Sequence, residues 1–188
     1  MSGQTTLKPH DVVVVCQIAM EPNDAWTYET ISQKLRLSTA EICNVIKRAD
    51  RAGLLTKRPR RDGQRTTVDK AHLFDFIVHG VPTAFFPQRT EVVKGVPTAT
   101  YSPLYRGRFQ TESGIPVVWP YSKGKETGEG LIPLFPAAPL VCPQHDVLYN
   151  LLSSIDVLRI GRQREKDAAV TAIAGILQVD PRTETGSI

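Results

Sequence analysis

The sequence predicts an α+β fold, because helical and extended patterns occupy different parts of the 188-residue chain. Apolar residues recur at helical spacing in the first third of the chain and again near its end. Between these parts, residues 81–143 hold ten of the fourteen prolines, which nearly excludes long helices. We therefore expect an N-terminal domain at residues 8–80, a Pro/Gly-rich β or irregular connector at 81–143, two C-terminal helices at 144–179 and a flexible tail at 180–188.

Two short helices are expected first. Pro9 suits the first turn of a helix, and the run VVVVCQIAM follows it before a Pro-Asn-Asp turn. Four consecutive valines also fit a buried strand, so both interpretations remain open. Thr27 is a suitable N-cap for a second helix, on which Ile31 and Leu35 share one face.

A third helix is predicted over Ser38–Leu54. Ser38 and Glu41 have the spacing of a capping box, in which each side chain satisfies a free backbone amide of the first turn. The inward stripe at three- and four-residue intervals consists of Ile42, Val45, Ile46 and Ala49. The opposite face carries Ala40, Asn44, Lys47 and Arg51, with Cys43 and Arg48 at its flanks.

A basic hairpin is expected next. The segment LLTKRPRRDGQRTTVDK contains two short extended runs around Asp62-Gly63, a pair that favours a tight turn. Pro59 suits only an edge position. The cations of this hairpin are Lys57, Arg58, Arg60, Arg61 and Arg65. A further helix, DKAHLFDFIVH, is expected to end at Gly80 as its C-cap.

Positive charge is concentrated in this region. Eleven Lys and Arg residues and four acidic residues lie between Lys34 and Lys70, whereas the whole chain has a net charge of +4. Such clusters favour nucleic acid, because neutralising phosphates releases condensed counterions. A solvated basic face without a partner is the alternative.

The stretch TYETISQKLRLSTAEICNVIKRADRAGLLTKRPRRDGQRTTVD resembles MarR-like bacterial transcriptional regulators with a winged helix-turn-helix fold, over residues 8–79. The resemblance implies a DNA-binding transcriptional regulator, a repressor or autoregulator, with its third helix in the major groove of double-stranded DNA and a basic wing, Lys57–Arg65, on the backbone or minor groove. The residues implied to face base edges are Thr39, Ala40, Cys43, Asn44 and Lys47. Those expected at the DNA backbone are Ser38, Arg48, Arg51, Lys57, Arg58, Arg60, Arg61 and Arg65. An Asn amide can bind adenine bidentately, and a Lys can reach guanine acceptors.

A protein-binding role is the second hypothesis, since winged helices also bind proteins. Residues 95–178 are similar to segments that follow winged helices in uncharacterised bacterial proteins, some encoded beside nucleotidyltransferase-like toxin genes. That similarity implies an antitoxin or adaptor whose C-terminal part binds a partner protein. The amphipathic pattern of residues 146–160 fits either a helix covering its own core or the interface of a homodimer, which we expect for a regulator reading a pseudo-palindrome.

Catalytic signals are weak, and we expect no enzyme, metal or cofactor. His10, His72, His79 and His145 have no metal-ligand spacing, and the glycines of GKETGEG, residues 124–130, lack a phosphate-binding context, so an exposed turn is expected there. Cys16, Cys43 and Cys142 suggest reduced thiols, with a redox switch at Cys16 or Cys43 as an alternative. No signal peptide or membrane-spanning run is recognised, so we expect a cytoplasmic protein.

The pentapeptide GVPTA occurs twice, at residues 80–84 and 95–99. The flanking residues differ, so no longer repeat is indicated. We expect both copies to form a turn followed by a strand near a domain junction.

Overall fold

The structure is a computed structural model that describes residues 6–22, 25–60, 63–109 and 114–181. Its mixture of helices and small sheets confirms the predicted α+β class. The longer helices are α1 (Pro9–Ala19), α2 (Tyr28–Leu35), α3 (Thr39–Arg51), α7 (Asp146–Ile160) and α8 (Gln163–Leu177). Among the helices described, none combines the length and apolar character needed to traverse a lipid bilayer.

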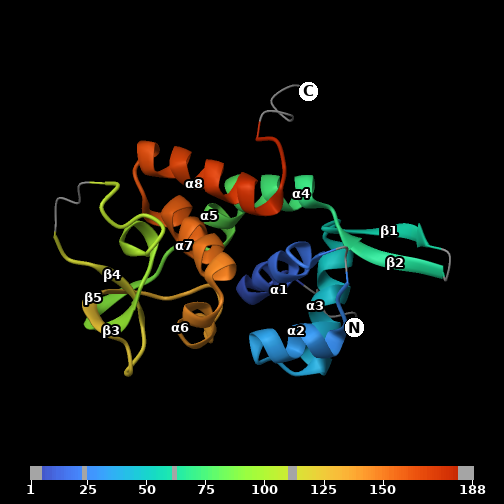
Figure 1. Ribbon diagram of the computed structural model, residues 1–188, viewed down its shortest axis with the longest axis horizontal. Helices are drawn as coiled ribbons and strands as arrows, with labels where there is room; N and C mark the ends of the chain where they lie inside the picture. The colour runs from blue at the N-terminus through green and yellow to red at the C-terminus, as the bar shows by residue number, and fades with distance from the viewer. Residues whose placement is uncertain (1–5, 23–24, 61–62, 110–113, 182–188) are drawn as a thin grey trace.

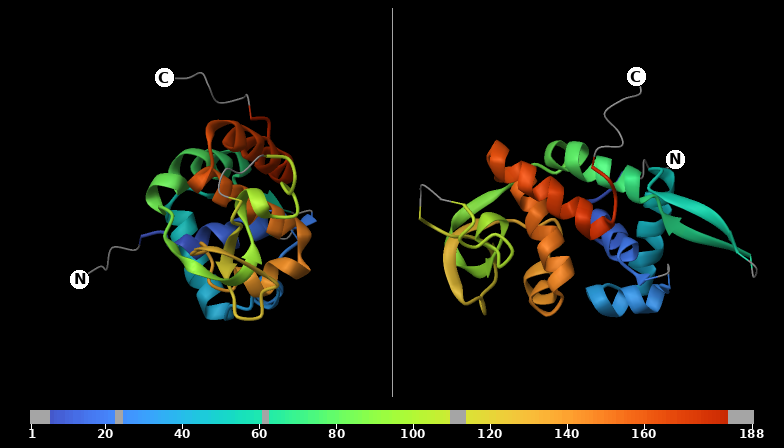
Figure 2. Two further views of the ribbon diagram at one scale, coloured as in Figure 1. Left: turned by 90° about the vertical axis from the view of Figure 1, so that its left-hand side faces the viewer. Right: turned by 45° about the horizontal axis from the view of Figure 1, so that its top comes forward.

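The two β elements lie at opposite ends of the long axis of the molecule (Figure 1). One is the hairpin β1 (Leu55–Arg60) and β2 (Gly63–Val68), which extends away from the helices in the right-hand view of Figure 2. The other is a small sheet of β3 (Arg89–Pro97), β4 (Val117–Pro120) and β5 (Glu126–Leu131). Helices α1, α7 and α8 lie between them.

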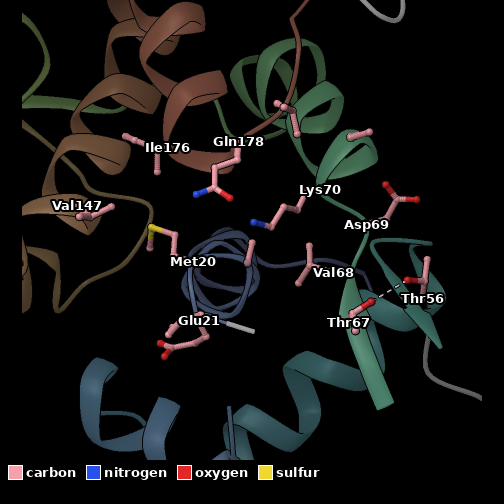
Figure 3. A pocket seen from close by; sticks show the side chains of 14 residues that line it. Met20, Glu21, Thr56, Thr67, Val68, Asp69, Lys70, Val147, Ile176 and Gln178 are labelled. Carbon is pink, nitrogen blue, oxygen red and sulfur yellow. Dashed lines mark hydrogen bonds between the residues drawn. The ribbon is translucent and has the colours of Figure 1, made fainter. Parts of the chain in front are cut away.

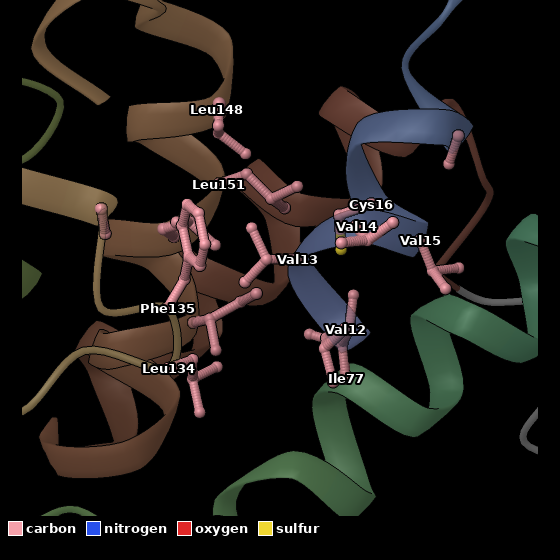
Figure 4. Close-up of a cluster of buried hydrophobic side chains, with 14 of the residues drawn as sticks. Val12, Val13, Val14, Val15, Cys16, Ile77, Leu134, Phe135, Leu148 and Leu151 are labelled. Atoms are coloured by element: carbon pink, nitrogen blue, oxygen red, sulfur yellow. The ribbon is translucent and has the colours of Figure 1, made fainter. Parts of the chain in front are cut away.

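Helix α1 is buried on every side, which explains why its four valines form a helix and not a strand. All residues from Asp11 to Ala19 are buried. Figure 4 shows the valine side chains between Leu148, Leu151 and Phe135 on one side and Ile77 on the other. A helix that is apolar all round belongs in a core, and here that core is one continuous cluster running from Val12 to Leu177.

A bent helix crosses the expected boundary between residues 80 and 81. It consists of α4 (Lys70–Asp75), the π-helical turn η2 (Phe76–Gly80) and α5 (Val81–Ala84). Gly80 has helical φ and ψ angles of −90° and −49°, so it is not the C-cap that we expected. The Val81 amide donates to the Phe76 carbonyl, five residues back, and such a π turn relieves the clash of Pro82 with the preceding turn. Val81 is fully buried in the common core, so no domain boundary lies at this point.

The three strands at the other end close on one another. Strand β3 pairs antiparallel with both β4 and β5, and β4 pairs parallel with β5. The segment GKETGEG is therefore largely strand β5, and not the exposed turn that we expected. Its glycines permit close backbone approach: a Cβ on Gly128 would collide with the Pro116 carbonyl, and one on Gly95 in β3 would collide with the Trp119 carbonyl.

Helix α7 spans Asp146–Ile160 as predicted, and a polar network joins it to this sheet. The buried Asp156 carboxylate accepts hydrogen bonds from Trp119 Nε1 at 2.6 Å, Thr98 Oγ1 at 2.8 Å and Arg159 Nη1 at 2.7 Å. Burial raises the pKa of Asp156, against the lowering effects of Arg159 and of the two neutral donors. Nearly every residue of α7 from Leu148 to Leu158 is buried within this chain. The helix thus covers its own core, and its apolar face is not free to form the expected dimer interface.

Candidate nucleic-acid interface

Helices α2 and α3 are joined by a three-residue turn that the local sequence specifies at both ends. Arg36 ends α2 in the left-handed conformation, with a φ of 54°, and Ser32 Oγ donates to the Leu37 carbonyl at 2.6 Å. Ser38 then caps α3 by accepting a hydrogen bond from the Glu41 amide at 3.1 Å. The predicted cap residues Thr27 and Ser38 are thus confirmed.

The predicted faces of α3 are also confirmed. The buried stripe is Ile42, Val45, Ile46 and Ala49, and it packs toward α1 and α2. On the other side, the exposed residues are Ser38, Thr39, Ala40, Asn44, Lys47 and Arg51, and Cys43 is half-buried. Within the described residues, neither Asn44 nor Lys47 forms a side-chain hydrogen bond or an ion pair. Their polar groups therefore face solvent.

Arg48 does not belong to this exposed face, and its expected contact with DNA phosphate is wrong. Its guanidinium is buried and donates to both carboxylate oxygens of Asp11 in α1, through Nε and Nη2, each at 2.7 Å. Nη2 also donates to Glu41 Oε1 at 2.7 Å. The bidentate bond to Asp11 raises the pKa of Arg48, so its charge is permanent but balanced inside the protein.

Glu41 completes a cluster with His10 and Asp11. His10 Nε2 lies 2.9 Å from Glu41 Oε1, and the hydrogen bonds of His10 and Arg48 lower the pKa of Glu41 from 4.5 to about 2. The Glu41 side chain is thereby held away from the Ser38 amide, so only half of the predicted capping box forms. Ligand atoms of His10, Asp11 and Glu41 lie within 4.8 Å of one another. The Arg48 guanidinium, which bonds both carboxylates, supplies the positive charge in this cluster.

The hairpin lies beside α3 and carries the rest of the predicted basic surface (Figure 1). Its antiparallel register places Arg58 opposite Arg65 and Arg60 opposite Gly63. Gly63 is therefore a paired strand residue, and not a central residue of the expected Asp62-Gly63 turn. Lys57 is exposed; Arg61 and the side chains of Arg58, Arg60 and Arg65 lie outside the described residues.

A groove of about 850 Å³ opens at the base of the hairpin. Figure 3 shows Lys70 and Gln178 extending into it from opposite sides, with Met20 below them and the Thr56–Thr67 pair, 3.0 Å apart, at its edge. The groove separates the strands from the ends of α7 and α8. The hairpin therefore contacts the body mainly through α1 and α3, and β2 is joined to α4 through Asp69.

The cysteines give no support to a redox switch at Cys16. That thiol is fully buried, and burial raises its pKa to about 12, which disfavours the reactive thiolate. Burial likewise raises the pKa of Cys142. Cys43 is half-buried on the flank of α3.

Sequence reasoning missed the roles of His10 and Asp11. A signal was present, because Lys8 and Asp11 have the spacing of a capping box, and the Lys8 amide does donate to Asp11 Oδ2 at 2.9 Å. The pairing of Asp11 with Arg48, 37 residues away, has no local signal.

Comparison with known proteins identifies no relative. No model of a protein family, no sequence of a curated protein and no solved structure matches this chain. The functional conclusion therefore depends on the geometry and charge of α3 and the hairpin.

Proposed function

We propose that this protein is a sequence-specific, double-stranded DNA-binding transcriptional regulator with a winged helix-turn-helix. The observation that carries the proposal is the outward face of α3, on which Thr39, Ala40, Asn44 and Lys47 are exposed beside a projecting basic hairpin. An α-helix fits the major groove of DNA, and its exposed amide and ammonium groups can bind base edges there. The arginines of the hairpin suit the phosphate backbone.

Some basic side chains of this region already form ion pairs with acidic side chains of the protein. Arg48 is balanced by Asp11 and Glu41, and Lys34 is paired with Glu21 at 2.6 Å. Lys47 on the exposed face of α3 forms no ion pair within the described residues, so its charge is available to DNA. We propose Asn44 and Lys47 as the principal base-reading residues.

The test begins with selection of duplexes from a random pool by the full-length protein, followed by fluorescence anisotropy with the selected and a scrambled duplex. Specific recognition predicts affinity about 10³-fold higher for the selected duplex. Both affinities should fall steeply between about 50 and 200 mM salt, with a log–log slope of about −0.9 for each neutralised phosphate. Absence of binding at low salt, or equal affinity for both duplexes, would reject a sequence-specific regulator.

A protein-binding function, as an antitoxin or adaptor, is a second candidate that one observation favours. Phe86 is 65% exposed and Ile132 is 40% exposed, and both line one cavity of about 180 Å³ far from the hairpin. Exposed apolar side chains that cluster in this way occur at protein interfaces. Light scattering on the wild type and on Phe86→Ser distinguishes the cases. A homodimer through this surface becomes a monomer in the variant, whereas a surface for another protein leaves the mass of the isolated chain unchanged.

A further inference from the structure

A third concave site lies at the opposite end of the molecule from the hairpin. It has a volume of about 580 Å³, within the range of small-molecule sites. We call it the Pro/Tyr pocket, after six of the residues that line it: Pro97, Pro103, Tyr121, Pro139, Pro143 and Tyr149. These residues come from β3, from the segments after η3 (Ala99–Tyr101) and β4, and from the region of α6 (Ala138–Val141) through α7.

Local contacts hold these walls in place without a ligand. The Tyr149 hydroxyl donates to the Pro97 carbonyl at 2.6 Å, and the Tyr121 amide donates to the Lys94 carbonyl at 2.9 Å. Gly124 lies directly against the backbone of Gly95, where a Cβ would collide. Proline walls and tied loops lose little conformational entropy when a ligand binds, so the pocket is already organised for one.

The charges at the rim favour an anion. Arg106 and Glu126 line the pocket and form an ion pair with each other. Lys123 and Lys125 also line it, and neither forms an ion pair within the described residues. The surplus is therefore two positive charges beside an apolar, aromatic-lined cavity.

We infer that the Pro/Tyr pocket binds a small amphipathic anion, with an apolar or aromatic body against the tyrosines and prolines and an acidic group at Lys123 and Lys125. The cavity volume suits a single small molecule. Because the site shares no residue with α3 or the hairpin, the inference holds whether or not the protein binds DNA.

Two fluorescent probes that share an anilinonaphthalene ring system test this inference on the full chain. The anionic probe is 8-anilinonaphthalene-1-sulfonate, and its neutral counterpart is N-phenyl-1-naphthylamine. Replacing both lysines, as Lys123→Gln/Lys125→Gln, should weaken binding of the sulfonate about three- to tenfold, the range that two partly exposed charge contacts supply. Binding of the neutral probe should change less than about twofold, since it forms no charge contact.

A cavity-filling variant and a control charge variant locate the effect. Leu140→Trp, on the wall of the pocket, should weaken binding of both probes about tenfold by occupying their space. Lys166→Gln on α8 removes a charge outside the pocket and should leave both affinities unchanged. The lysine variants alter only residues at the rim, so they keep the test valid if Leu140→Trp fails to fold. An unchanged sulfonate affinity in the double lysine variant would overturn the inference, as would equal weakening by Lys166→Gln.

Discussion

Arg48 of α3 and Asp11 of α1 are joined by two N–H···O bonds of 2.7 Å, and both side chains are almost completely buried. Asp11 also accepts the Lys8 amide and so caps α1. One carboxylate thereby begins α1 and fixes the flank of α3 against it. The neighbouring face, with Asn44 and Lys47, is left to solvent.

Loss of Arg48 is expected to act on stability and not on DNA contacts. Arg48→Met leaves the Asp11 carboxylate buried without its partner, which should reduce the free energy of unfolding by about 3–5 kcal/mol. Lys47→Met, at the adjacent exposed position, should change it by less than about 0.5 kcal/mol. Urea unfolding followed by circular dichroism measures both. An Arg48→Met protein that retains its stability yet loses DNA affinity would show that Arg48 reaches DNA after all.

The Glu41 cluster should make stability depend on acid pH. Hydrogen bonds from His10 and Arg48 lower the pKa of Glu41 from 4.5 to about 2 in the folded state. A lowered carboxyl pKa contributes stability above the unfolded value, and this contribution disappears as the pH falls from about 4.5 toward 2. Glu41→Gln should therefore be less stable than the wild type at about pH 6, and the difference in unfolding free energy should shrink below about pH 4.5. A difference that stays constant from about pH 6 to about pH 2.5 would contradict this account.

Base-reading and backbone-contacting residues should give different signatures in DNA binding. Asn44→Ala removes an amide suited to one base. It should reduce the difference in binding free energy between the selected and the scrambled duplex by about 1–3 kcal/mol. Arg60→Ala/Arg61→Ala should weaken binding of both duplexes about equally and make the salt slope shallower by about one unit for each phosphate that is no longer neutralised. Fluorescence anisotropy with the two duplexes across a salt series measures both quantities. Reversed signatures would show that the hairpin, and not α3, reads the sequence.

The Asp156 network should be essential to the junction between α7 and the small sheet. Asp156→Ala removes the acceptor of Trp119 Nε1 and of Thr98 Oγ1. It also removes the carboxylate partner of the buried Arg159 guanidinium, which keeps only backbone carbonyls as acceptors. We therefore expect a loss of about 3–5 kcal/mol in unfolding free energy. Asp156→Asn keeps one acceptor oxygen and should lose less, since part of the network can persist. Thermal and urea unfolding of the three proteins should therefore rank wild type, Asn variant and Ala variant. Equal stability of the two variants would show that the network contributes little.

Two glycines with opposite surroundings give a matched pair. Gly95→Ala places a Cβ against the Trp119 carbonyl and should disrupt the pairing of β3 with β4. A Cβ added to Gly175 in α8 would meet no neighbouring atom within 4 Å, so Gly175→Ala should stabilise the protein by about 0.5–1 kcal/mol through helix propensity. Melting temperatures should move in opposite directions. An unchanged melting temperature for Gly95→Ala would mean that β3 and β4 can move apart without loss of stability.

The sequence by itself determined the helices with strong local signals. Thr27 and Ser38 each cap a helix because their hydroxyl groups satisfy backbone amides within three residues, and the apolar period of residues 146–160 produced the bounds of α7. The three- and four-residue spacing of apolar residues in α3 likewise predicted which of its residues are exposed. These features depend only on neighbours along the chain.

Tertiary structure decided the features that depend on distant partners. The position of Arg48 on a helical wheel predicts a surface cation, but its side chain is buried because it forms an ion pair with Asp11. The four valines of α1 form a helix because α7 and η2 surround them. GVPTA shows this dependence most directly. Its first copy continues a helix through Ala84, whereas its second forms the last three residues of strand β3 and ends at Ala99, whose φ is 50°. The two copies share the same local preferences but differ in structure, because only the second copy lies where its backbone can pair with β4 and β5.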